Sequence, residues 1–242
     1  MNPPLSSLKE FFKKLADHDN DRFRSFEHCY RYFNILKGNL TDETLDKAML
    51  HLGFYLASWG MYRGSSFLLQ KDYKIYEPII RKLLEKKFLK LRNLDKLLNS
   101  NNIHNLSELT FSLHGEIQEI LELERTAYIE YMEKDLPKER VSSTLTTKVM
   151  MGTLGCIPAY DRFYKTGIKI YCQNNHKKLL QNFSENSIRA IYGFMLEIKD
   201  ELVTLQTQIA VMTGFKCPLM KLIDSYFWLI GYDEEEKKKK SI

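Results

Sequence analysis

The chain has 242 residues, 44% of them hydrophobic and 28% charged, with a formal net charge of +5. This composition is typical of a globular protein and excludes a disordered chain. No apolar run approaches the roughly 18 residues of a membrane helix, and the first residues lack a basic stretch followed by an apolar one. The sequence therefore predicts a cytoplasmic protein without a membrane segment.

Apolar residues recur at intervals of three and four along most of the chain, which predicts helices, and no two-residue alternation predicts a strand. The helices expected in chain order cover residues 5–16, 23–36, 41–59, 76–91, 107–132, 142–152, 160–173, 187–212 and 219–230, with a short turn at 94–98. We expect an all-α fold with a single domain over residues 1–232. It is either undivided or split into helical subdomains 1–98 and 107–232 around a cleft. Residues 233–242 read as a charged, frayed tail.

The four cysteines are far apart and form no CxxC pair, which indicates reduced thiols, and the six histidines are scattered. No zinc site, other metal site or cofactor is therefore expected. His28 and His51 lie among aromatic residues, and we interpret both as core histidines, with a general base as the alternative for His28.

Charge is distributed unevenly. Ten Lys and Arg face four Asp and Glu between residues 63 and 96, nine acids face three bases between 108 and 139, and six bases face one acid between 142 and 182. Two basic segments that flank an acidic one are able to form a positive face for a polyanion. The alternative is that each run is a solvated helix face.

The most informative stretch is residues 146–163, TTKVMMGTLGCIPAYDRF. A helix that carries Lys148 ends at a Gly-rich turn, Pro158 stiffens the exit, and Asp161 stands where the next helix begins. An Asp at that position accepts backbone N–H groups as an N-cap. A cap alone is one interpretation of Asp161, and a surface lysine is the corresponding interpretation of Lys148.

This arrangement resembles the core of the helical DNA glycosylase superfamily, together with the ending KCPLMKLIDSYFW at residues 216–228. The resemblance covers the second half of the chain. It implies that Asp161 stabilises the positive charge that develops on the sugar, or activates a water there, while a modified or damaged base is flipped into a pocket. It also implies double-stranded DNA, possibly with modified bases, as the partner, a role in repair or antiphage defence, and Lys148 as a Schiff-base nucleophile if burial depresses its pKa.

The sequence departs from the superfamily in two places. The stretch 137–145 before Lys148 has no Gly-x-Gly hairpin for gripping a DNA phosphate, and the distance from Lys148 to Asp161 is shorter than the pattern implies. Phosphate binding is then expected from the start of the following helix and from nearby bases. The residues expected to contact DNA are Ser142, Ser143, Thr144, Arg162, Lys165 and Lys169.

A second stretch, residues 59–70, supplies a candidate base pocket. Trp59, Arg63, Ser66 and Gln70 recur at intervals of four, three and four, which would place them on one helical face, with Tyr62 beside it. Gly60 and Gly64 weaken a helix, which indicates close approach by a ligand or by another helix. The alternative is a tight helix crossing in which Arg63 pairs with an acid of residues 108–139.

Three functional hypotheses remain. The first is a base-excising DNA glycosylase, and the second is a non-catalytic helical interaction or defence module in which Asp161 only caps a helix. The third, an RNA-cleaving helical nuclease, is disfavoured because no Arg-x4–6-His motif is present. The absence of P-loop, dinucleotide-binding, HExxH and GxSxG motifs argues against the corresponding enzyme classes.

Overall fold

The computed structural model describes residues 4–18, 20–36, 40–64, 66–133 and 140–240. Within these ranges the chain is helical and contains no β-strand, so the predicted all-α fold is confirmed. No helix in the described part of the chain is apolar over enough of its length to cross a bilayer. The helices are α1 (Leu8–Ala16), α2 (Arg24–Ile35), α3 (Asp42–Ser58), α4 (Glu77–Leu83), α5 (Lys86–Leu89), α6 (Leu94–Leu97), α7 (Ile103–Tyr131), α8 (Ser143–Leu154), α9 (Arg162–Asn175), α10 (Glu185–Glu197), α11 (Lys199–Thr213) and α12 (Leu219–Lys240).

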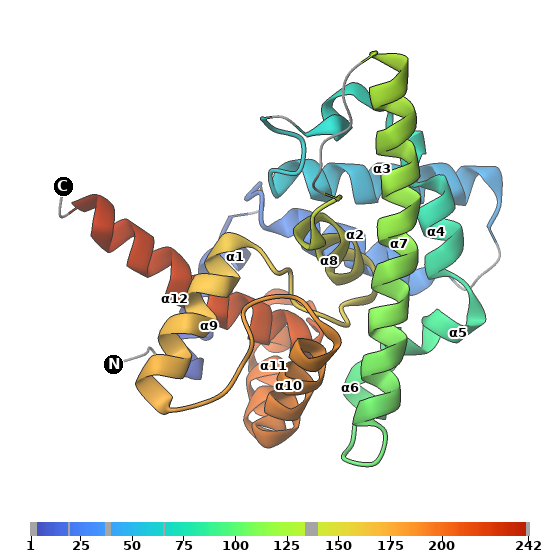
Figure 1. The fold of residues 1–242 in the computed structure, drawn as a ribbon. Coiled ribbons are helices and arrows are strands. Elements are labelled where there is room, and N and C mark those ends of the chain that lie inside the picture. Colours follow the sequence, from blue (N-terminus) through green and yellow to red (C-terminus); the bar gives the residue numbers. More distant parts are fainter. Residues whose placement is uncertain (1–3, 19, 37–39, 65, 134–139, 241–242) are drawn as a thin grey trace.

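Helix α8 occupies the centre of the molecule. It packs on α2, α3 and α7, and every residue from 145 to 160 is buried. In Figure 1 the long helix α7 runs along one side of α8, and α9 and α12 lie together on the other. Buried residues from both the first and the second half of the chain belong to one hydrophobic cluster. The loop that follows α8 is therefore enclosed by the fold.

Several helix boundaries follow from local side-chain chemistry. Thr41 and Thr44 form a capping box at the start of α3, and Ser184 and Ser187 form another at α10. Gly155 ends α8 with a φ of 62°, a left-handed conformation that glycine adopts without steric cost. These signals explain why the helices at 41–59 and 142–152 were predicted close to their observed bounds.

The stretch after Ser58 differs from the prediction. Gly60 and Gly64 have φ values of 74° and 61°, so the chain leaves the helix there. A short 3-10 helix, Phe67–Gln70, follows. The predicted helical face from Trp59 to Gln70 is therefore wrong, because left-handed glycines redirect the backbone twice within that stretch.

Three other boundaries differ as well. The helix expected at 76–91 is divided into α4, α5 and short 3-10 turns. The one expected at 187–212 is interrupted at Ile198, whose φ of −110° and ψ of 20° end α10. Helix α12 continues through the segment expected to fray and is helical to Lys240, with Lys239 Nζ 2.8 Å from Glu236 Oε1. Residues 241–242 lie outside the described part of the chain.

Helices α9 and α12 pack backbone to backbone. A Cβ atom placed on Gly167 of α9 would lie 1.8 Å from the Phe227 carbonyl oxygen of α12. One placed on Gly231 of α12 would lie 2.0 Å from the Phe163 carbonyl oxygen. Since real Cβ atoms do not approach carbonyl oxygens this closely, the two glycines fix the distance between the helices.

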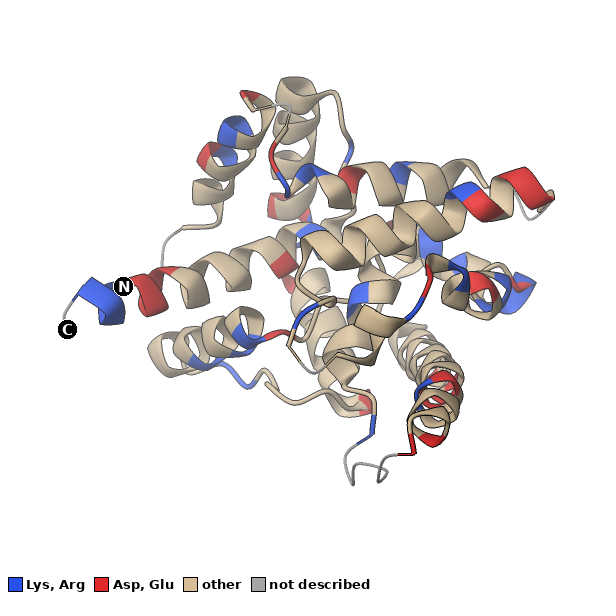
Figure 2. Ribbon diagram, turned by 90° about the horizontal axis from the view of Figure 1, so that it is seen from above, with Lys and Arg blue, Asp and Glu red and all other residues tan. Residues whose placement is uncertain are grey.

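Three lysines of the first basic segment pair with acids of helix α7. Lys71 lies 3.3 Å from Glu124, and both Lys82 and Lys87 lie 2.9 Å from Glu116. Figure 2 shows blue and red segments interspersed over the molecule rather than gathered on one side. Such partly exposed pairs add little stability, but they reduce the contribution of these three lysines to a continuous positive face.

His114 on α7 is buried and stacks on Phe183, with ring centroids 3.9 Å apart. Burial lowers its pKa to about 4, because the charged imidazolium would lose its hydration. The folded protein therefore keeps His114 neutral under conditions in which an unfolded chain would protonate it.

The free energy of unfolding is expected to decrease as the pH is lowered from 7 to 5, partly because of His114. The unfolded chain binds a proton below about pH 6.5 and the folded chain does not, so the free energy of unfolding decreases by about 2 kcal/mol at pH 5. Urea denaturation of the wild type and of His114→Phe at both pH values measures this contribution. An equal decrease in both proteins would contradict the assignment, since all other titrating groups are shared.

Candidate active site

Lys148 and Asp161 form a buried ion pair, and the turn between α8 and α9 creates it. Lys148 Nζ donates to Asp161 Oδ2 over 3.0 Å, and the side chains are 3% and 14% exposed. Asp161 Oδ1 also accepts the Tyr164 N–H over 3.1 Å, which confirms the predicted N-cap of α9. Lys148 is therefore not a surface lysine, and Asp161 has two partners.

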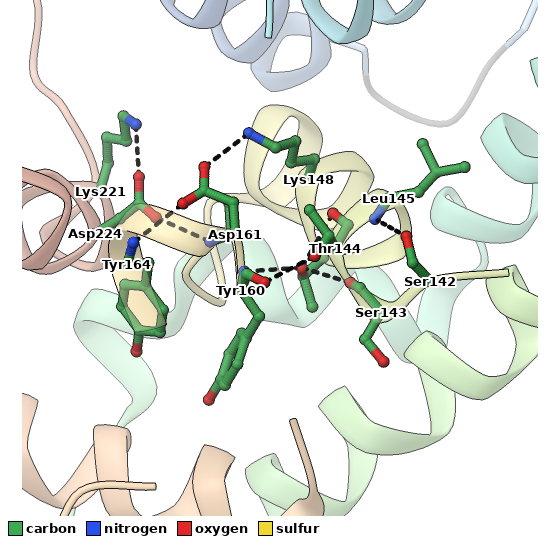
Figure 3. A network of polar contacts seen from close by, with 12 residues as sticks. Ser142, Ser143, Thr144, Leu145, Lys148, Tyr160, Asp161, Tyr164, Lys221 and Asp224 are labelled. Atoms are coloured by element: carbon green, nitrogen blue, oxygen red, sulfur yellow. Dashed lines mark hydrogen bonds and ion pairs between the residues drawn. The ribbon is translucent and has the colours of Figure 1, made fainter. Parts of the chain in front are cut away.

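Threonines of α8 hold the loop that leads to Asp161. The Thr144 hydroxyl donates to the Tyr160 carbonyl over 2.8 Å, and the Thr147 hydroxyl accepts the Tyr160 N–H over 3.1 Å. The contact between Thr144 and Tyr160 appears in Figure 3. Both the N–H and the carbonyl of Tyr160 are thus hydrogen-bonded to α8, which helps to fix the position of the neighbouring Asp161.

A second ion pair, which the sequence analysis did not assign, lies on α12. Lys221 Nζ donates to Asp224 Oδ2 over 2.7 Å, and these side chains are 9% and 5% exposed. Asp224 Oδ1 accepts the Ala159 N–H over 2.9 Å, so α12 is bonded to the same loop (Figure 3). The sequence signal was available: a Lys and an Asp three residues apart stand in an otherwise apolar stretch of helix.

The Trp59 ring is close to both ammonium groups. Lys148 Nζ is 4.9 Å from its centroid and Lys221 Nζ is 4.8 Å from it. Both distances are within the range of cation–π attraction. The Trp59 indole N–H is buried and has no acceptor among the described residues. Of the predicted pocket residues, Trp59 is thus the one that contacts Lys148, the partner of Asp161.

An aromatic pocket adjoins Trp59 and Lys221. It encloses a cavity of about 40 Å³, and α1 forms one wall of it. Its lining residues come from α1, α2, the end of α3, the end of α11 and α12: Phe11, Phe12, Leu15, Ala16, Phe23, Arg24, Phe26, Glu27, Trp59, Thr213, Phe215, Lys221, Ser225 and Trp228. Apolar walls with a few convergent polar groups are typical of small-molecule sites.

The other predicted pocket residues lie elsewhere. The Tyr62 hydroxyl is 2.6 Å from the Tyr76 hydroxyl, and Arg63 is exposed with its guanidinium over Gly60. Ser66 caps the 3-10 helix that ends at the exposed Gln70. These four do not line the aromatic pocket, because the turn at Gly60 takes the chain away from it. No ion pair between Arg63 and α7 is seen within the described ranges.

The residues expected to bind DNA lie at the start of α8 and on α9. Ser142 accepts the Leu145 N–H as the cap of α8, and the Ser143 carbonyl accepts the Thr147 hydroxyl. The residues of the missing hairpin at 137–139 lie outside the described part of the chain. On α9, Arg162 pairs with Glu235 at 3.0 Å, Lys165 is half-buried and Lys169 is exposed.

The charges of Asp161 and Asp224 act on the phenol of Tyr55 on α3. Burial raises the pKa of its phenol well above the ordinary value, and the charges of Asp224 and Asp161 raise it further. Its hydroxyl therefore stays protonated at neutral pH.

The expectation that His28 is a core residue is wrong, since His28 is exposed on α2. His51 is half-buried and stacks on Tyr32.

One cluster on the surface has the composition of a metal site: His104, Glu108 and Glu185. A guanidinium nitrogen of Arg189 lies 2.6 Å from both His104 Nδ1 and Glu185 Oε1. Because Arg189 already contacts both His104 and Glu185, the cluster is better described as a surface ion-pair network.

The chain was compared with protein-family models, with curated proteins and with solved structures, and none of them matches it.

Proposed function

We propose that this chain is a base-excising enzyme, similar to a DNA N-glycosylase, in which Asp161 acts on the sugar of a flipped nucleotide. The observation that carries the proposal is the buried Lys148–Asp161 pair, in which Lys148 Nζ lies 4.9 Å from the centroid of Trp59. Trp59 in turn lines the aromatic pocket. A role in DNA repair or in defence against phage DNA with modified bases fits this activity.

The chemistry depends on where positive charge develops. When an N-glycosidic bond breaks, the sugar becomes oxocarbenium-like, and a fixed carboxylate stabilises it more strongly in a dry site than in water. Among the four charged side chains around Trp59, Asp161 is the most exposed. It is therefore the one best placed to meet a sugar or an attacking water.

Lys148 has a positioning role in this proposal. Its ammonium bonds Asp161 Oδ2 while the Tyr164 N–H bonds Oδ1, so the carboxylate is fixed in orientation before substrate arrives. Preorganisation of this kind removes a reorganisation cost from the reaction step. A Schiff-base role would require Lys148 to leave Asp161.

The aromatic pocket is the proposed site of the flipped base. Phe23, Phe26 and Trp228 supply ring faces, and the Trp59 N–H, which has no acceptor in the described ranges, is the proposed donor. Flipped bases are held by such stacking and by a few hydrogen bonds. The cavity of about 40 Å³ has room for a few water molecules, so its walls must separate before a base enters.

A structural role for Asp161 is the second candidate, and one observation favours it. Both carboxylate oxygens already have partners within the protein, one on α8 and one in the backbone of α9. In that case the chain is a non-catalytic helical module, and the pair only joins two helices.

Asp161→Asn separates the two candidates. Asparagine keeps the N-cap acceptor and removes the charge, so the proposed enzyme loses about 100-fold or more in rate. The assay incubates duplexes that carry different damaged or modified bases with the protein and counts abasic sites. Asp224→Asn is the matched control, because it removes the charge from the other buried pair.

The rates are compared at a temperature at which circular dichroism shows both variants folded. Selective loss in Asp161→Asn supports the enzyme. Equal losses in the two variants, or no abasic sites with wild-type protein on any duplex, would favour the structural role.

A further inference from the structure

A groove runs along the outer face of α2, next to the aromatic pocket. His28, Arg31, Tyr32 and Ile35 recur at helical spacing and line it from α2, and His51 of α3 lines it as well. Phe215 and Lys216, in the loop after α11, form the opposite side. The groove has a volume of about 550 Å³, and Phe215 also lines the aromatic pocket.

The groove is positively charged. Lys216 is exposed and takes part in no ion pair or hydrogen bond with the described residues. The Arg31 side chain is 47% exposed, although it bonds Glu27 Oε1 and the Gly214 carbonyl, both over 2.8 Å. No carboxylate belongs to the described lining of the groove. A ligand with negative charge is therefore favoured there.

Flat side chains form the walls. The His51 and Tyr32 rings are stacked, with centroids 4.5 Å apart and planes inclined by 21°. The Tyr32 hydroxyl donates to the Thr44 carbonyl over 3.0 Å, and the Arg31 guanidinium lies 4.7 Å from the Phe215 centroid. These contacts hold the ring planes in place before any ligand binds.

We propose that this groove binds a single-stranded segment of nucleic acid, with phosphates at Lys216 and Arg31 and a base against the His51–Tyr32 stack. Aromatic platforms combined with a basic track are the usual way in which proteins hold single strands. An acidic peptide would use the charges but not the rings. This proposal rests on the proposed function, because Phe215 lines both the groove and the aromatic pocket. It adds that the substrate strand is unpaired next to the excised base.

The nearby acids compensate Arg31 but leave Lys216 without a carboxylate at ion-pair distance among the described residues. Glu27 pairs with Arg31 at 2.8 Å and also contacts Arg24, and Glu43 pairs with Lys47 at 2.6 Å. Asp95 lies near Lys216 but is largely buried, and it accepts the Leu219 N–H over 3.0 Å. The Lys216 ammonium is thus the least compensated cation of the groove.

The test is fluorescence anisotropy with a labelled oligothymidine of about 12 nucleotides, the corresponding duplex, and polyglutamate as a competitor. Lys216→Glu is expected to weaken strand binding about ten-fold at low salt and to flatten its salt dependence. Lys86→Glu, the same change on α5 outside the groove, serves as the control. His51→Ala is expected to weaken binding about ten-fold, and His51→Phe to restore it.

Equal effects of Lys216→Glu and Lys86→Glu would overturn the proposal, and so would tighter binding of the duplex or displacement by polyglutamate at equal charge. The outcome is separate from that of the abasic-site assay. Strand binding without base excision would support the proposed groove and contradict the proposed enzyme activity. Base excision without strand binding would support the enzyme activity and contradict the groove.

Discussion

Gly167→Ala is expected to lower the free energy of unfolding by about 4 kcal/mol, or to prevent folding. The added methyl group would lie 1.8 Å from the Phe227 carbonyl oxygen, so α9 and α12 must move apart. Separation of the helices disturbs the packing around Phe227, which is fully buried. The Phe227 carbonyl oxygen belongs to the backbone and cannot rotate away, whereas the end of a flexible side chain could. Urea denaturation followed by circular dichroism measures the effect.

Gly115→Ala on α7 is the matched control. A Cβ atom there would meet nothing within 4 Å, and alanine is the better helix former. The variant is expected to gain about 0.4–1 kcal/mol, mostly because the unfolded chain loses freedom. If Gly167→Ala stayed within about 1 kcal/mol of the wild type, the close approach of α9 and α12 would be wrong.

Asp224→Leu is expected to cost about 3–5 kcal/mol. The substitution leaves the Lys221 ammonium, 7% exposed as a residue, without its carboxylate, and it removes the acceptor of the Ala159 N–H. A buried charge without a partner is far less favourable than a buried pair. The midpoint and slope of urea denaturation report the loss.

The double variant Lys221→Met/Asp224→Leu tests the cause. Replacing both charges by apolar side chains of similar size is expected to recover most of the stability, because no buried ion remains. The coupling energy of the double-mutant cycle is then large and favourable. Additive losses would show that the backbone contact to Ala159, rather than the ion pair, stabilises this part of the fold.

Local signals in the sequence were sufficient for many helices. Capping residues such as Thr41 and a left-handed glycine such as Gly155 act within one turn of the chain, so the sequence carries their effect directly. The N-cap at Asp161 is of the same kind. The break at Ile198 has no proline or glycine to mark it, and the apolar spacing continues across it. Tertiary packing decides such a boundary.

The candidate site was predictable only in part. Lys148 and Asp161 were both singled out from the sequence, but the ion pair between them was not predicted. The bond from Asp224 to Ala159 joins residues 65 positions apart, and no periodicity reports such a contact. Trp59 was expected to act together with its sequence neighbours, but its nearest polar partners are the lysines of α8 and α12. A constellation assembled from four elements becomes visible only in the folded chain.

Helix α1 closes one side of the aromatic pocket with Phe11, Phe12 and Leu15. If the pocket holds a nucleobase as proposed, the ligand enters only after a wall has moved, because the cavity of about 40 Å³ is too small for it. The observed dissociation constant would then equal the intrinsic one divided by the open fraction. If α1 is the wall that moves, the stability of its contact with α11 would contribute to how tightly the pocket binds.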